Sequence, residues 1–558
     1  MKKLLTYSCA ALSAGSLLAE TAWFATVEVD SLQTLQVGIE SFCKATGIPA
    51  PPNLTSDALK ELLPVPDAAA LLSLNDPVRV FVVGDTEQPI TQGGEPSFLF
   101  AITLPAEAKA LQDQLAKLYT ARRDDGNAIT FSTPAPEAGL LPPNMVLSVM
   151  ERNKALLATS KEAMTWFKQQ PKVDAFLPLA GTQTVRACIN MKQIALPKLP
   201  DGTPNPAAAM MADVEYLSLA VTPNAQAFSL TYGIRLKPGS ALEGLMNMYK
   251  APDAALWNGL PENALFGYVG PNSKRDENTI KFLKAYLPDV PVTIDPMLTK
   301  LDNAVTGDII RYLAPTKDKK GLRLIDVDPI KDAAAVKEII KTLDQVEASP
   351  GVKFKKEESR KIGEQTIERY SMVFDMAAMM QAQGAPPEAA ANMGTAGMVM
   401  GMLSRMFVME LTVKDNYLLS AWGPANATDD WLPTLPFPAA TVTLDKKIVA
   451  FDPTAKPLLG AAEVRLMPFL KQIVSMLPNA KAEHINLFAA QTDPIQTWTS
   501  RAADGTLVAT IRVPVNEIAA FVKLTQQDMS VFQELAFAIF AAQMQQMTPP
   551  AAIPPPNF

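Results

Sequence analysis

The sequence is poor in the residues that most often carry out catalysis. Its 558 residues include one histidine, His484, and three cysteines. A Ser-His-Asp or Cys-His catalytic set would have to use His484, which we place just before a strand at residues 485–488. Zinc sites need three or four closely spaced Cys or His ligands, and no phosphate-binding or dinucleotide-binding loop occurs in the sequence. We therefore predict that the protein is not an enzyme and has no catalytic, cofactor-binding or metal-binding residues.

Basic residues and aromatic residues are also in short supply. The net charge is −7, and aromatic side chains make up 7% of the chain. Nucleic acids and anionic lipids are bound by clustered Lys and Arg, so we expect neither as a partner. No segment combines an acid with clustered aromatic residues, as sugar sites often do. One catalytic alternative stays open, a hydrolase whose paired carboxylates come from separated segments.

The first 19 residues have the pattern of a signal peptide. Lys2 and Lys3 precede a short apolar stretch that ends in Ser16-Leu17-Leu18-Ala19. The stretch is too short and too polar to span a bilayer, so we predict cleavage near Ala19 and export to the periplasm or the extracellular space. Cleavage would change the net charge from −7 to −9 and leave Cys43 and Cys188. These two thiols are expected to form one disulfide or to stay separately buried.

Internal repetition is the main organisational feature of the remaining chain. Four segments recur in the same order, and each has the same strand-then-helix or hairpin pattern in both copies. The matched ranges are 19–27 with 261–269, 98–118 with 322–343, 145–160 with 407–422, and 228–249 with 505–524. We therefore predict two diverged lobes, residues 20–252 and residues 253–527.

Each lobe is predicted to belong to the α+β class. Tight turns join residues 216–221 to 227–236 and residues 495–501 to 507–513, which favours antiparallel pairing. Strict βαβ alternation is absent, so we expect antiparallel sheets with helices packed on one face. Asp328 precedes Pro329, and this pair predicts a helix N-cap followed by proline at the first helical position.

Two segments have no counterpart in the other lobe. The insert at residues 376–406 is rich in methionine, and we take five of its side chains as candidate ligand or partner contacts: Met393, Met398, Met400, Met402 and Met406. Their thioethers could pack a core or lobe interface, contact a protein or lipid, or bind Cu(I). Residues 528–558 are predicted to form an amphipathic helix and a proline-rich tail. That helix is expected to dock on the second lobe or to mediate self-association.

The chain resembles a family of uncharacterised exported bacterial proteins, a domain of unknown function. The resemblance rests on the opening Leu260-Pro261-Glu262-Asn263-Ala264-Leu265-Phe266-Gly267-Tyr268-Val269 and on Arg235-Leu236-Lys237-Pro238-Gly239-Ser240. It implies duplicated α+β lobes and no catalytic residue. Together these observations predict an exported, non-enzymatic binding or scaffold protein with no cofactor and no transmembrane span in the mature chain. The alternatives are a carrier of lipid or another apolar ligand, and the hydrolase described above.

Overall fold

We describe a computed structural model of the chain. The described residues are 21–50, 71–85, 96–105, 109–125, 128–134, 144–151, 153–169, 183–194, 206–261, 264–272, 277–286, 296–316, 321–345, 347–349, 352–374, 408–423, 443–476 and 482–527. The predicted signal peptide, the methionine-rich insert and the C-terminal segment 528–558 therefore lie outside the described residues. The chain forms two compact units. Unit 1 comprises Met1–Met246, Ala285–Leu287 and Arg501–Val515, and unit 2 comprises Asn247–Lys284, Pro288–Ser500 and Asn516–Phe558.

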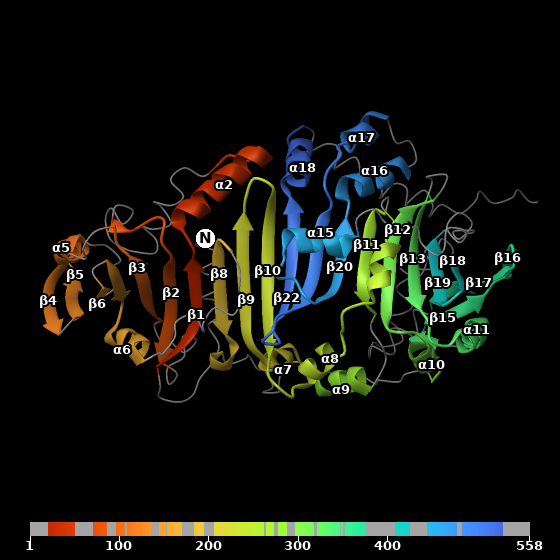
Figure 1. The fold of residues 1–558 in the computed structure, drawn as a ribbon, viewed down its shortest axis with the longest axis horizontal. Coiled ribbons are helices and arrows are strands. Elements are labelled where there is room, and N and C mark those ends of the chain that lie inside the picture. The colour runs from red at the N-terminus through yellow and green to blue at the C-terminus, as the bar shows by residue number, and fades with distance from the viewer. Residues whose placement is uncertain are drawn as a thin grey trace, which may run out of the picture. The chain divides into compact units, whose positions relative to one another are not determined.

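Unit 1 contains an antiparallel sheet in which the first strand of the chain is central. Figure 1 shows these strands side by side, and their pairings give the order β4, β5, β6, β7, β3, β2, β1, β8, β9, β10, β22. The strands are β1 (Thr21–Val29), β2 (Val78–Asp85), β3 (Ser97–Thr103), β4 (Tyr119–Asp125), β5 (Ala128–Pro134), β6 (Asn144–Glu151), β7 (Lys154–Ala158), β8 (Val185–Asn190), β9 (Val214–Pro223), β10 (Ala227–Leu236) and β22 (Leu507–Pro514). The predicted turn between residues 216–221 and 227–236 is confirmed by β9 and β10.

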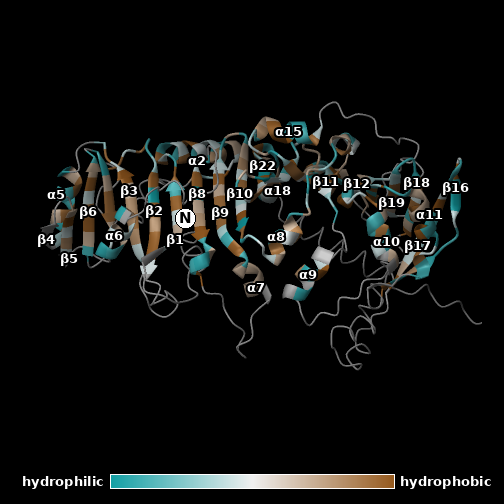
Figure 2. Cartoon of the chain, turned by 60° about the horizontal axis from the view of Figure 1, so that its bottom comes forward, coloured by the Kyte–Doolittle hydropathy of each residue, from teal (hydrophilic) through white to brown (hydrophobic). Residues whose placement is uncertain are grey.

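Helices cover both faces of the unit 1 sheet. Its described helices are α2 (Leu32–Thr46), α5 (Lys109–Leu118), α6 (Lys161–Gln169), α7 (Pro206–Ala212), α8 (Ala241–Met246) and the 3₁₀ turn η4 (Met191–Gln193). Val80 on β2 packs in one core with α2 and α5, whereas the next residue, Phe81, packs in a second core with α6. Successive strand residues point to opposite faces, so our prediction of helices on one face is wrong. Figure 2 shows hydrophobic residues along these strands.

Unit 2 also contains an antiparallel sheet, with β11 in its interior. The pairings give the order β14, β15, β17, β18, β19, β13, β12, β11, β20, β21, and β16 pairs with β17. The strands are β11 (Phe266–Pro271), β12 (Asp308–Pro315), β13 (Leu322–Pro329), β14 (Glu347–Ser349), β15 (Val352–Lys356), β16 (Arg360–Ile362), β17 (Gln365–Phe374), β18 (Val408–Lys414), β19 (Tyr417–Gly423), β20 (Leu458–Val464) and β21 (Ile495–Arg501).

Helices cover both faces here as well. The helices in the described part of unit 2 are η5 (Ala254–Gly259), α9 (Glu277–Tyr286), α10 (Pro296–Ala304), α11 (Ala333–Lys341), η6 (Leu343–Gln345), α15 (Leu444–Phe451), α16 (Leu466–Met476), α17 (Ala482–Leu487) and α18 (Val515–Gln527). The ends of α9 and α18 belong to unit 1. Leu418 on β19 lies in a core with α11, and Leu419 lies in a second core with η5 and α15. The described part of the chain is thus α+β with large antiparallel sheets, and none of its helices is long and apolar enough to cross a membrane.

Two local predictions are corrected in unit 2. Asp328 lies within β13, and the N-cap of α11 is Asp332, whose side chain accepts a hydrogen bond from the Ala335 amide at 2.9 Å. Proline ends the strand here and does not start the helix, because the chain continues to pair as far as Pro329. His484 lies in the short helix α17 and not before a strand. Ile485 and Phe488 pack in a core with α16, which a helical spacing allows.

Candidate functional site

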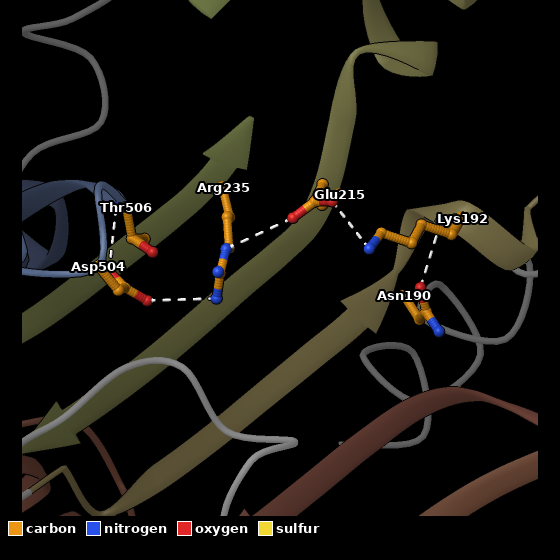
Figure 3. Close-up of polar contacts among 6 residues, drawn as sticks. All are labelled: Asn190, Lys192, Glu215, Arg235, Asp504 and Thr506. Carbon is orange, nitrogen blue, oxygen red and sulfur yellow. Dashed lines mark hydrogen bonds and ion pairs between the residues drawn. The ribbon is translucent and has the colours of Figure 1, made fainter. Parts of the chain in front are cut away.

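A row of charged side chains in unit 1 is our candidate functional site. Figure 3 shows how they gather from four separate segments of the chain. Lys192 lies in η4 just after β8, Glu215 lies on β9 and Arg235 lies near the end of β10. Asp504 lies in the turn that precedes β22. The order β8, β9, β10, β22 in the sheet therefore brings together residues that are far apart in sequence.

The charges alternate along the row. Lys192 Nζ lies 2.8 Å from Glu215 Oε1, and Arg235 Nε lies 3.4 Å from Glu215 Oε2. The other end of the Arg235 guanidinium, Nη1, lies 3.5 Å from Asp504 Oδ2. Each carboxylate thus contacts a cation, and Arg235 links the two carboxylates.

Backbone hydrogen bonds fix the ends of the row. Asp504 Oδ1 accepts a hydrogen bond from the Thr506 amide at 3.0 Å, which holds the turn before β22. Asn190 Oδ1 accepts one from the Lys192 amide at 3.2 Å, and its Nδ2 donates to the Trp23 carbonyl at 3.2 Å. These contacts set the positions of Asp504 and Lys192 before any ligand binds.

An aromatic pair lies beside the row. Trp23 and Tyr216 are stacked, with ring centroids 5.9 Å apart and an angle of 8° between their planes. Lys192 Nζ lies 5.3 Å and the Arg235 guanidinium carbon 5.9 Å from the centre of the Tyr216 ring. Cations at such distances are attracted to the negative face of an aromatic ring. No single segment of the sequence combines an acid with clustered aromatic residues, but the fold stacks Trp23 of β1 on Tyr216, the residue next to Glu215.

The exposure of the row suits binding. Glu215 is the inner member, with 15% of its side chain exposed, whereas Lys192 and Arg235 are 43% and 41% exposed and Asp504 is 39% exposed. The hydrogen bond with Glu215 raises the pKa of Lys192, so this ammonium stays charged at neutral pH. Three charged groups therefore face solvent in fixed positions and can contact a polar ligand.

The row is not arranged like the carboxylate pair of a hydrolase. In such enzymes two carboxyl groups face each other across the scissile bond, with space for substrate and, in inverting enzymes, for water. Here the guanidinium of Arg235 contacts both Glu215 and Asp504 and occupies the space between them. No group of three or more His, Cys, Asp or Glu side chains within the described ranges could hold a metal ion. The arrangement can recognise and orient a ligand.

Five methionines were predicted from the sequence as ligand or partner contacts, and all of them lie outside the described residues: Met393, Met398, Met400, Met402 and Met406. Cys43 on α2 and Cys188 on β8 are both buried in unit 1 and are not paired with each other. Burial raises the pKa of the Cys188 thiol to about 11, so Cys188 is a poor nucleophile.

Sequence reasoning missed every member of the row. The signal that could have suggested it is weak: Glu215-Tyr216 opens one strand of the hairpin, and Arg235 lies near the end of the other. A link from this hairpin to Trp23 or Asp504 needs the strand order, which has no local sequence signature. No protein-family model matches the chain, and no curated protein or solved structure is detectably similar to it.

Proposed function

We propose that this protein is an exported, non-enzymatic binding protein, built from a duplicated lobe, that recognises a polar ligand through the row Lys192, Glu215, Arg235 and Asp504. The observation that carries the proposal is the convergence of exposed, oriented charges of both signs beside Tyr216. Lys192, Arg235 and Asp504 are each partly exposed, so their charged groups are open to a ligand.

The strand order within each unit supports the duplication. In unit 1 the first strand, β1, pairs with the second strand, β2, and with the later strand β8. In unit 2 β11 pairs with β12 and with the later strand β20. The next strands, β3 and β13, pair with β7 and β19, and each of these is the second strand of a hairpin.

One pairing register gives further support. The repeat that matches 228–249 with 505–524 aligns Ile234-Arg235 with Ile511-Arg512 and therefore Tyr232 with Ala509. In unit 1 β10 pairs antiparallel with β22, and Tyr232 stands directly opposite Ala509. The two residues that the repeat makes equivalent are therefore also direct partners across the two strands. Two copies of one strand related by a local two-fold axis have this property.

The binding proposal is tested on a printed array of oligosaccharides and charged peptides. We expect wild-type protein to bind a subset of the array and the double variant Lys192→Ala/Arg235→Ala to lose at least tenfold in signal on that subset. The control is Lys154→Ala, because Lys154 forms an exposed ion pair with Glu151 in the same unit. Equal binding by all three proteins, or no binding by wild type, would contradict the proposal.

A second candidate, a carrier of lipid or another apolar ligand, is favoured by an exposed apolar sheet face in unit 1. Tyr232 and Ile234 on β10 and Ile511 on β22 are 41%, 37% and 38% exposed. The register places all three on one face, because Ile234 pairs with Leu507, four residues from Ile511. Native mass spectrometry of protein purified without detergent tests this function.

If the protein is a lipid carrier, we expect lipid to co-purify with the wild-type protein and to be missing from the variant Ile234→Asp/Ile511→Asp. Val37→Asp is the control, since Val37 is 49% exposed on α2. Wild-type protein without bound lipid would count against a carrier and would leave the polar-ligand proposal intact.

A further inference from the structure

Three buried polar atoms on two neighbouring strands of unit 2 have no hydrogen-bond partner in the described part of the chain. They are Glu463 Oε2 on β20, and Gln496 Oε1 and Trp498 Nε1 on β21. The three residues are only 2%, 3% and 3% exposed. A buried polar atom without a partner is costly, and native proteins leave few of them. These three atoms therefore need an explanation.

The pairing register places the three side chains on one face of the sheet. Glu463 stands directly opposite Gln496, and Ala461 stands opposite Trp498. Opposed residues share a face, and so do residues two apart on one strand. Glu463 and Trp498 are thus diagonal neighbours, at a spacing that long side chains can bridge. Two acceptor oxygens and one donor N–H therefore lie in one small region.

Apolar side chains enclose this region. Trp498 packs in the core that also contains Leu260 at the end of η5 and Leu444 on α15. On β11, Gly267 stands opposite Glu463, and a Cβ on Gly267 would lie 2.2 Å from Leu260 Cδ1. Leu260 therefore fills the space that a larger residue at Gly267 would need. Any molecule that binds the three polar atoms must be small.

The charge of Glu463 is balanced, but its hydrogen-bonding capacity is not used. Lys447 Nζ on α15 lies 3.8 Å from Glu463 Oε2, and Arg465 Nη2 lies 3.8 Å from Glu463 Oε1. Both separations are too long for a hydrogen bond, although charges attract each other at this distance. Two cations around one carboxylate leave no need for a third, so a neutral molecule is favoured over an ammonium or metal ion.

Water is the neutral molecule whose hydrogen-bonding groups match the three atoms. It donates two hydrogen bonds and accepts one, and buried waters typically make about three hydrogen bonds to polar groups that lack other partners. We propose that Glu463, Gln496 and Trp498 form a binding site for one buried water molecule, which donates to Glu463 Oε2 and Gln496 Oε1 and accepts from Trp498 Nε1. This site would join β20 to β21 through their side chains, and it does not depend on the charged row in unit 1.

A crystal structure of the full chain, at a resolution that shows ordered water, tests the site directly. We expect one peak of solvent density about 2.7–3.2 Å from each of the three atoms. The contact with Trp498 identifies water, because a cation cannot accept a hydrogen bond from an indole N–H. No peak, a direct hydrogen bond between Gln496 and Glu463, or a peak without the Trp498 contact would overturn the proposal.

The sign of a stability change tests the site in solution. Gln496→Met removes an acceptor and keeps the approximate length of the side chain. Replacing an acceptor that has no partner removes a cost, so without the water this variant should unfold at higher urea. With the water, the variant deprives Glu463 and Trp498 of their shared partner. We then expect the equilibrium constant for unfolding to rise about tenfold and the urea midpoint to fall.

The matched control is Gln345→Met, because Gln345 is exposed in η6 of the same unit. Its urea midpoint should equal that of wild type. A midpoint for Gln496→Met that is higher than in wild type, or unchanged, would contradict the water site. If Gln496→Met does not fold, the crystal structure of wild type decides, since it needs no variant.

Discussion

At the residue scale, two buried glutamates are each held by two arginines. Glu28 on β1 is almost wholly buried and contacts Arg79 on β2 and Arg186 on β8. In unit 2, Glu410 on β18 is fully buried and contacts Arg360 and Arg369. A buried charge is tolerated only when it is paired and hydrogen-bonded, so each carboxylate fixes the side chains of neighbouring strands.

The first prediction concerns Glu28. Replacement by Gln removes the charge that Arg79 and Arg186 contact, and we expect it to lower the free energy of unfolding by about 3–5 kcal/mol. Urea denaturation monitored by tryptophan fluorescence measures the loss. Glu151→Gln is the control, because its pair with Lys154 is exposed and should contribute less than about 1 kcal/mol. Similar losses in the two variants would show that the charge of Glu28 does not stabilise unit 1.

The second prediction concerns the two thiols. Cys43 and Cys188 are buried and unpaired, and the pKa of Cys188 is raised to about 11, so the reactive thiolate is scarce at pH 8. We expect neither to react with DTNB in the native protein over an hour, and both to react within minutes in denaturant. Peptide mapping by mass spectrometry identifies the labelled residues. Rapid labelling of Cys188 in the native protein would contradict the burial that we describe.

At the element scale, local signals predicted some elements and failed for others. The turn between β9 and β10 was predictable because Thr222-Pro223-Asn224 interrupts two apolar runs. The sequence analysis did not predict that both faces of the sheet are buried, although the sequence of β2 indicates it. Val80, Phe81, Val82 and Val83 are consecutive apolar residues, and all four are buried. Such a run is typical of a strand covered on both sides, whereas alternation is typical of one covered face.

The candidate site could not be predicted for a different physical reason. Trp23 and Tyr216 stack because β8 alone separates β1 from β9 in the sheet. Strand order is set by packing of the whole unit and leaves no pattern in a short window of sequence. Asp328 was taken for a helix cap because Asp-Pro is common at helix starts, but pairing with β19 continues the strand.

The third prediction compares the effect on stability of replacing two helical glycines by alanine. A Cβ on Gly38 in α2 would lie 2.6 Å from the backbone oxygen of Pro223, whereas a Cβ on Gly244 in α8 would meet no atom within 4 Å. Gly244→Ala should raise stability by about 0.5–1 kcal/mol through helix propensity. Gly38→Ala has the same propensity gain, but α2 must move away from β9, and we expect a net loss of about 1–2 kcal/mol.

Thermal unfolding of the two glycine variants, followed by circular dichroism, measures these changes. The opposite signs make the comparison informative, since each variant is the control for the other. A higher melting temperature for Gly38→Ala would show that α2 is free to shift on the sheet. No change for Gly244→Ala would show that α8 contributes little to the cooperative unit.

At the scale of the whole molecule, unit 1 is completed by a strand from near the end of the described chain. β22 pairs with β10 over eight residue pairs, from Ala227↔Pro514 to Ile234↔Leu507. Thr231 and Thr510 also form a hydrogen bond between their hydroxyls at 3.1 Å. A chain that stops after the first predicted lobe would therefore leave β10 without this neighbour.

The fourth prediction follows from that open edge. A fragment of residues 20–252 would expose the backbone N–H and C=O groups of β10, and an uncovered edge strand is a template for pairing. Because β22 is aligned with β10 in the repeat and pairs with it antiparallel, a second fragment can supply its own β10 in the same way, centred on Tyr232. We expect such fragments to be dimers in size-exclusion chromatography with light scattering.

Two controls make the fragment experiment decisive. Leu230→Pro removes a backbone donor from the middle of β10 and should give a monomer, because proline cannot complete a ladder of strand hydrogen bonds. A synthetic peptide with the sequence of residues 505–515 should compete with self-pairing and shift wild-type fragments toward monomers. A monomeric wild-type fragment at tens of micromolar would argue against a shared origin of β10 and β22, because two strands derived from one parent should be able to replace each other.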